Sequence, residues 1–356
     1  MSTISPSKTN RIEYIDVIKG FSILWVVLYH IVGADYWTSA PYRLPLFFFL
    51  SGIFFSKKPF DQFFLRRINT LIVPFVVFMI IPYLILLFKY EFLAKILHVE
   101  NVGPEKTWSI ILGFFNIFKF SHDIFHESLV LNIPLWFLIG LFLIQMFFYG
   151  LSFFTDKRIY IISISLIIYV ISVICLDKGI NGPLLIPFTF KYLIYYAIGS
   201  LYGKKLINYI KVKHNKIVLL ITSLPILIIL SYINFDSFFQ LSLIIKALSF
   251  IVLAFLFFQE SYQFMVFKPL QFFGRNSLIV LVTHYIIIKQ SYPLFLRTFQ
   301  IMGIEDMKNS SLYILSMLLL VCIGEYFLII LLNRYFPQFV AKKDVFISKK
   351  VIAERM

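Results

Sequence analysis

Three ionisable residues, Asp16, Lys19 and His30, lie within one apolar stretch near the N-terminus. Ionisable groups inside a membrane-spanning segment are costly, so they are candidates for function. In an α-helix, Lys19 and His30 differ by about 20° around the axis, and Asp16 and His30 by about 40°. The three side chains therefore share one stripe, with His30 about 16 Å along the axis from Lys19. Imidazole titrates near neutrality, which makes His30 a candidate general base.

Each of these residues also has a purely structural interpretation. Asp16 and Lys19 are three residues apart and can form an ion pair near the membrane surface. The Lys19 side chain can also extend to the lipid headgroups. His30 can be a neutral histidine that hydrogen-bonds a neighbouring helix. The sequence leaves these alternatives open.

A second histidine lies in a late apolar segment. Ser277 and His284 are seven residues apart, so on a helix they share a face to within about 20°. His284 can approach His30, or it can form an ordinary hydrogen bond between helices. Three further ionisable residues lie in or next to apolar segments, and the sequence indicates no partner for them: Lys246, Lys289 and Glu325.

Arg66 and Arg67 precede another apolar run. Arginines at this position usually anchor a helix end on the cytoplasmic side, but they can equally bind a phosphate through bidentate contacts. Ser51 and Gly52 combine a small packing surface with one hydroxyl group. Spacings typical of zinc ligands are missing, and we interpret Cys175 and Cys322 as small apolar residues.

The composition defines the elements that must position these residues. The chain has 356 residues, of which 60% are hydrophobic and 14% charged, whereas soluble proteins are about half apolar and a quarter charged. The mean hydropathy is +0.86. These values exclude an ordinary soluble enzyme and a disordered chain. Because the apolar runs are continuous rather than alternating, they favour helices over a membrane β-barrel. We expect an all-α, polytopic integral membrane protein.

A membrane-spanning helix needs about 20 largely apolar residues. About ten segments meet this requirement: 14–34, 41–56, 70–90, 133–154, 159–176, 185–203, 216–234, 238–258, 272–295 and 311–332. The connection at about 91–132 is the longest and contains a short apolar stretch, which suggests an interfacial or re-entrant helix. We expect one membrane domain over residues 1–356, with short tails at about 1–13 and 334–356.

The chain has a formal net charge of +15, and the positions of its basic residues agree with these segments. With ten spans, Lys and Arg concentrate in alternate loops, as the positive-inside rule requires when both termini are cytoplasmic. The long connection at 91–132 is then external. The basic charge therefore points to the lipid bilayer rather than to nucleic acid as a partner.

Four segments of the chain, at Lys19–His30, Leu46–Gly52, Pro134–Leu138 and Gly274–Leu278 with His284, resemble in the same order segments of the acyltransferase-3 family of membrane proteins. In the first segment, that family has a basic residue, ten intervening positions and a histidine, and Lys19 and His30 fit this pattern. The other three segments are similar to the "FFFLSG", "LWFL" and "GRNSL…H" motifs of the family: Leu46–Gly52, Pro134–Leu138 and Gly274–Leu278 with His284.

The resemblance implies transfer of an acetyl group from cytoplasmic acetyl-CoA to a hydroxyl group of a cell-surface glycan or its lipid-linked precursor. It is closest to the sugar O-acetyltransferase branch, similar to fucose 4-O-acetylases, in the cell (plasma or inner) membrane. It implies His30 as the catalytic histidine and no permanently bound cofactor or metal. The family also has an Arg-x-x-Arg pattern after its second helix. Arg67 fits the first position, but Thr70 occupies the second.

We therefore assign two groups of site residues. The catalytic candidates are His30 as general base, Asp16, and Ser51 or His284 as donors to the oxyanion. The candidates for binding acetyl-CoA or the acceptor are Lys19, Arg66, Arg67, Arg275, Asn276, Ser277 and Trp136. We expect direct transfer, because no strong nucleophile accompanies His30 in the sequence.

Two other classes of function fit the same composition. A transporter or flippase for a lipid-linked sugar or a small anion would use intramembrane histidine and lysine to gate its cargo. A non-catalytic scaffold would leave the stripe of Asp16, Lys19 and His30 without a role. Binding of acetyl-CoA to the purified protein discriminates the enzyme from a flippase.

Overall fold

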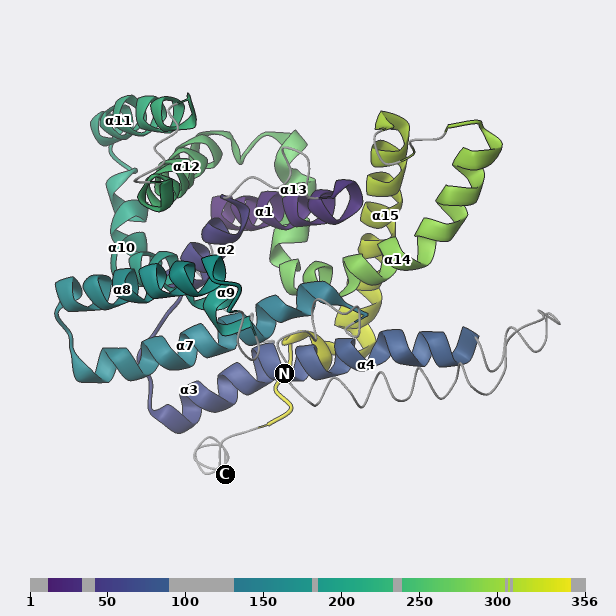
Figure 1. The fold of residues 1–356 in the computed structure, drawn as a ribbon, viewed down its shortest axis with the longest axis horizontal. Coiled ribbons are helices and arrows are strands. Elements are labelled where there is room, and N and C mark those ends of the chain that lie inside the picture. The colour runs from purple at the N-terminus through teal and green to yellow at the C-terminus, as the bar shows by residue number, and fades with distance from the viewer. Residues whose placement is uncertain are drawn as a thin grey trace, which may run out of the picture. The chain divides into compact units, whose positions relative to one another are not determined.

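The computed structural model describes residues 12–33, 42–89, 131–180, 185–232, 239–304, 307 and 310–346. Within these ranges every regular element is a helix (Figure 1). The all-α class is therefore confirmed for the described residues. Residues 91–130 of the expected external connection lie outside them, as do residues 1–11 of the first tail and 347–356 of the second.

Eight helical stretches among the described residues are long and apolar enough to cross a membrane. Each of the eight corresponds to one of the ten expected segments. They are α1 (Glu13–Val32), α3 (Phe60–Arg67) continued by η2 (Ile68–Ile72) and α4 (Val73–Leu87), η5 (Ile133–Leu135) with α7 (Trp136–Phe154), α8 (Arg158–Asp177), α11 (Lys213–Tyr232), α12 (Phe239–Ser261), α14 (Ser277–Ile301) and α15 (Ser311–Tyr335).

The expected count of ten spans is not confirmed, because two segments form shorter helices. The segment at 41–56 forms α2 (Arg43–Ile53), which has only 11 residues. The segment at 185–203 is divided into α9 (Ile186–Phe190) and α10 (Leu193–Tyr209). The chain turns at Lys191 and Tyr192, between these two helices. Neither piece reaches the roughly 20 residues that a perpendicular span requires.

The stretch expected at 70–90 begins ten residues earlier, at Phe60, because α3 runs into α4 without a break. A proline inside a helix lacks an N–H donor and its ring clashes with the carbonyl group four residues earlier. Here Pro74 follows the π-helical turn Ile68–Ile72, whose wider hydrogen-bonding pattern accommodates the proline. Arg66 and Arg67 therefore belong to the same continuous helical stretch as the apolar run to Leu87.

The chain folds into two compact units. Unit 1 comprises Met1–Val26, Ala40–Phe47 and Lys205–Ser277, and unit 2 comprises Val27–Ser39, Phe48–Lys204 and Leu278–Met356. Helix α1 begins in unit 1 and ends in unit 2, and so does α2. We describe each unit by itself.

In unit 1, the first part of α1 packs closely on α13 (Lys268–Arg275). A Cβ atom at Gly274 would overlap the carbonyl oxygen of Asp16, and one at Gly20 would overlap that of Leu270. Only glycine permits such an approach of two helix backbones. Helices α11 and α12 pack against each other in the same unit (Figure 1).

In unit 2, α2 packs on α10 in a similar way. A Cβ atom at Gly52 would overlap the carbonyl oxygen of Tyr196, and one at Gly199 would overlap that of Phe49. Beside this contact, the ring of Phe48 stacks on a tyrosine ring between α9 and α10, with centroids 4.9 Å apart. The small residues of the second motif therefore serve helix packing.

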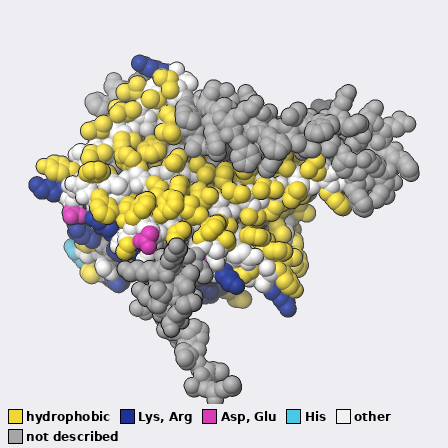
Figure 2. Space-filling model, turned by 90° about the horizontal axis from the view of Figure 1, so that it is seen from below, with side chains coloured by type: hydrophobic (Ala, Val, Ile, Leu, Met, Phe, Trp, Pro, Cys, Tyr) yellow, Lys and Arg dark blue, Asp and Glu magenta, His cyan; other side chains and the backbone are white. Residues whose placement is uncertain are grey.

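The surface of the described residues is strongly apolar. Figure 2 shows broad areas of hydrophobic side chains, with Lys and Arg at their margins. Phe154 is 90% exposed and Ile301 81% exposed. In the spanning window of α11 only 6% of residues are buried. Soluble proteins rarely expose such continuous apolar surface, so we conclude that lipid covers it.

Candidate active site

His30 lines a cavity of about 330 Å³ in unit 2. The end of α1 forms one wall, and side chains of α14 and α15 form the rest. The side chains with polar atoms in this lining are His30, Tyr285, Lys289, Tyr292 and Tyr313. Tyr285, Lys289 and Tyr292 follow at helical spacing, so one face of α14 supplies most of the polar lining.

The structure brings the two histidines together. The ring centroid of His30 lies 5.3 Å from that of His284 and 5.2 Å from that of Tyr285. His30 is half-buried at the cavity, whereas His284 has no exposed surface. The imidazole that can meet a substrate is therefore that of His30.

The hydrogen bonding of His284 indicates its tautomer. Its Nδ1 atom lies 2.6 Å from the carbonyl oxygen of Val280. A carbonyl oxygen only accepts, so Nδ1 carries the hydrogen and Nε2 of the neutral ring is an acceptor. Nε2 is buried, and it has no hydrogen-bond partner among the described residues. A buried polar atom without a partner is costly, which marks this position as more than packing.

Glu325 of α15 is buried beside this pair, and its partner is the residue next to His284. Thr283 Oγ1 lies 2.8 and 2.9 Å from the two carboxyl oxygens of Glu325, and 2.6 Å from the carbonyl oxygen of Ile279. These contacts join α14 to α15. The sequence indicated an intramembrane carboxyl group here but not the threonine that meets it.

Asp16 lies in unit 1, where its carboxylate is 3.4 Å from Nε of Arg275. Arg275 also lies 3.7 Å from Glu13. The spacing of Asp16 and Lys19 did not indicate this partner, which is distant in the sequence. The Arg275 guanidinium group therefore has two carboxylates beside it and helps to hold α13 against α1, while its proposed contact with acetyl-CoA stays a prediction.

Asn276 and Ser277 mark a break that the sequence did not predict. The expected segment 272–295 is interrupted, because α13 ends at Arg275 and α14 begins at Ser277. Asn276 Nδ2 donates a hydrogen bond of 2.9 Å to the carbonyl oxygen of Phe272 and so satisfies the end of α13. These contacts are structural, and roles of Asn276 and Ser277 in substrate binding stay predictions.

Arg66 and Arg67 lie in unit 2, at the end of α3. The Arg67 guanidinium group lies over the ring of Phe63, with its carbon 4.9 Å from the ring centroid. Its Nε atom is buried, and it has no hydrogen-bond partner among the described residues. Arg66 is exposed, and Thr70 donates to the Arg66 carbonyl oxygen at 2.8 Å. A planar cation with an unused donor suits an anionic ligand.

Ser51 and Trp136 do not line the His30 cavity. Ser51 adjoins the close helix contact at Gly52, and Trp136 packs on Phe188 with ring centroids 4.9 Å apart. Lys19 is half-buried on α1 in unit 1.

The tyrosines of the cavity are not among the site residues predicted from the sequence. Tyr285 directly follows His284, and Tyr292 lies two helical turns later on the same face. Their position relative to a candidate histidine was therefore a usable signal.

Among the described residues, no cluster of three or more His, Cys, Asp or Glu side chains could hold a metal ion. A family model described as an acyltransferase domain matches residues 12–330. No curated protein and no solved structure matches the chain significantly. The family match includes both the helix that carries His30 and the helix that carries His284.

Proposed function

Because the chain belongs to the acyltransferase-3 family and is an acyltransferase, we propose that it transfers an acetyl group from cytoplasmic acetyl-CoA to a hydroxyl group of a cell-surface glycan or its lipid-linked precursor. The observation that carries this proposal is the half-buried His30, which lines a cavity and lies beside the buried His284. A histidine next to a cavity can bind and deprotonate a hydroxyl group. The apolar helices make the chain a multi-pass membrane protein.

In the proposed reaction, His30 removes the proton of the acceptor hydroxyl as its oxygen attacks the thioester carbonyl carbon. A C–O bond forms, and the carbonyl oxygen becomes an oxyanion. Collapse of this intermediate breaks the C–S bond, and the His30 imidazolium returns its proton to the departing thiolate. The acetyl ester and CoA are the products, and no other reactant is needed.

The structure suggests different roles for the two histidines. Nε2 of a neutral His284 accepts hydrogen bonds, so His284 is a poor donor to the oxyanion. We assign it as a positioning residue that packs against the His30 ring, with the two ring centroids 5.3 Å apart, and so orients it. The hydroxyl groups of Tyr285 and Tyr292 line the cavity and are better candidates to stabilise the oxyanion.

The donor is anionic at its nucleotide end, which suits the Arg67 guanidinium group. We propose that this end binds from the cytoplasm, and that the pantetheine arm carries the acetyl group toward His30. Arg67 and His30 belong to the same unit of the structure. A two-step route would need a covalent acetyl-enzyme. Acetylation of Lys289, the amine in the cavity, would give a stable amide and stop turnover, so we expect direct transfer.

The test uses membrane vesicles that contain the protein, acetyl-labelled acetyl-CoA and the glycan and glycolipid fractions. We expect wild type to label an acceptor and His30→Ala to lower the rate by about 10²- to 10⁴-fold, the usual contribution of a general base. His214→Ala is the matched control, because His214 is exposed in unit 1. Equal rates for wild type and His30→Ala would exclude His30 as the base. A labelled acetyl-enzyme that persists without CoA and acceptor would contradict direct transfer.

A further inference from the structure

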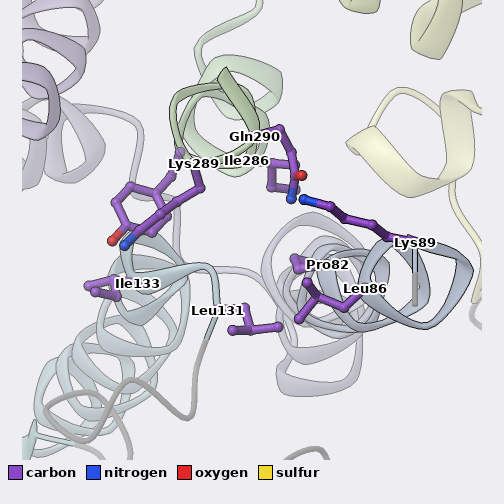
Figure 3. A pocket seen from close by; sticks show the side chains of 9 residues that line it. Pro82, Leu86, Lys89, Leu131, Ile133, Ile286, Lys289 and Gln290 are labelled. Carbon is purple, nitrogen blue, oxygen red and sulfur yellow. The ribbon is translucent and has the colours of Figure 1, made fainter. Parts of the chain in front are cut away.

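A second cavity, of about 240 Å³, adjoins the His30 cavity in unit 2. Its walls come from the end of α4, the start of η5 and the middle of α14 (Figure 3). Tyr285 and Lys289 line both cavities. The two cavities are therefore neighbours on one face of α14, and a ligand larger than the His30 cavity can extend into the second.

Two lysines give this second cavity a positive charge. Lys289 and Lys89 lie on opposite sides of it, and Lys89 extends toward Gln290 (Figure 3). The Lys289 ammonium group lies 5.4 Å from the centroid of the Tyr285 ring. Neither cavity is lined by an Asp or Glu residue in the part of the chain that the structure describes. Neither lysine has an ion pair with a described carboxylate.

An unneutralised lysine in the middle of a spanning helix is costly, so its position suggests a ligand. Lys289 lies near the middle of α14 and faces the two cavities. Lys89 lies 22 residues after Arg67 on one helical stretch, a separation of about 33 Å along the axis. The two lysines are thus far from the arginine that we assign to the phosphates of the donor.

We propose that the acceptor is an anionic glycan, whose phosphate or carboxylate group binds between Lys89 and Lys289 while a neighbouring hydroxyl lies at His30. This proposal rests on the proposed function and specifies its acceptor. Tyrosine rings suit the apolar faces of sugars, and the cavity at His30 lies near the lower end of the usual range of about 300–1,000 Å³ for small ligands. Two ammonium groups supply the charge-assisted hydrogen bonds that an anion requires.

The test separates the cell-envelope glycans by anion exchange into neutral and anionic pools. Each pool is incubated with labelled acetyl-CoA and vesicles that contain the full chain. We expect label in the anionic pool. Each of Lys89→Gln and Lys289→Gln should raise the KM for that pool by about tenfold or more, the effect of losing one charged hydrogen bond. The matched control is Lys178→Gln, an exposed lysine at the end of α8.

Two further measurements make the result decisive. Lys89→Arg and Lys289→Arg keep the charge and should restore most of the affinity, whereas a purely structural role of the lysines would not be restored. If the labelled product carries a uronic acid, amidation neutralises its carboxylate and should abolish its retention on the anion exchanger. If it carries a glycosyl phosphate, mild acid cleaves the phosphate from the sugar and should have the same effect. These two arms identify the source of the anion.

Label in the neutral pool would overturn the anionic acceptor and leave the acyltransferase proposal intact. Lysine variants that weaken the binding of acetyl-CoA, and not the use of the acceptor, would also overturn it, since the lysines would then bind the donor. Failure of wild type to label either pool would contradict the proposed function itself.

Discussion

The two histidines of unit 2 differ in their burial. His284 has no exposed surface and donates through Nδ1 to Val280, whereas His30 is half-buried and lines the cavity. A residue that never meets solvent can still act on the reaction by fixing the orientation of its neighbour. This division of roles makes different predictions for the two side chains.

We predict that His284→Ala lowers kcat by about 10- to 100-fold and leaves the Kd for acetyl-CoA unchanged, since it removes an orienting contact and no donor contact. His284→Gln should recover part of the loss, because its longer side chain restores part of the packing against the His30 ring. Single-turnover transfer and equilibrium binding of the donor are the measurements. A weaker Kd with an unchanged kcat would assign His284 to the donor site.

Thr283 offers a test of the buried carboxyl group beside it. Thr283 and Thr298 both lie on α14 and both hydrogen-bond the carbonyl oxygen four residues earlier, but only Thr283 meets Glu325. Thr283→Val leaves Glu325 buried without this partner and should cost about 1–3 kcal/mol of unfolding free energy. Thr298→Val is the matched control and should change it by less than about 0.5 kcal/mol. Unfolding in mixed detergent micelles measures both, and equal losses would refute a stabilising role of the contact with Glu325.

Helices as elements were largely predictable, and their interruptions were not. The apolar runs predicted eight stretches that the structure has. The division of α9 from α10, the π-helical turn before Pro74 and the break at Asn276 depend on backbone hydrogen bonding, which hydropathy does not report. Motif residues at these places look functional in the sequence, although Gly274 and Asn276 mainly shape α13 and its contact with α1.

This contact between α1 and α13 supports a prediction about elements. Gly274→Ala would place a methyl group in overlap with the Asp16 carbonyl oxygen, so the helices must separate. We expect a loss of about 3 kcal/mol or more of unfolding free energy. Gly150→Ala, in α7, is the control, because no atom lies within 4 Å of its added methyl group and alanine favours a helix. Tryptophan fluorescence during denaturation in detergent reports both, and a stable Gly274→Ala protein would contradict the close contact.

For the whole molecule, composition alone identified a polytopic membrane protein, but it left an enzyme, a transporter and a scaffold equally acceptable. Membership of an acyltransferase family favours the enzyme. The candidate site was partly predictable. Helical spacing placed His30 on one face of its helix with Asp16 and Lys19, and it placed His284 on one face with Ser277. The partners Tyr285, Lys289 and Glu325 come from other helices, and one sequence does not show which helices are neighbours.

The orientation in the membrane is a prediction for the whole chain. The positive-inside rule places the loop at Lys157 in the cytoplasm and the loop at Lys178 outside. In a variant without Cys175 and Cys322, a cysteine at 178 should react with an impermeant maleimide on intact cells. A cysteine at 157 should react only after permeabilisation. The reverse pattern would invert the orientation and place the donor at the other end of the helices.

The complete burial of His284, together with Val280 and Val282, also bears on the energy supply of the cell. A passage wide enough for a pantetheine arm and open at both ends would conduct protons and sodium ions. Each charge that leaks across 100 mV dissipates about 2.3 kcal/mol. An enzyme that passed acetyl groups outward, as we propose for this chain, would therefore have to keep one end of its passage shut. The fully buried side chains of Val280, Val282 and His284 are suited to this task, so that the proposed export of an acetyl group is compatible with retention of the proton gradient.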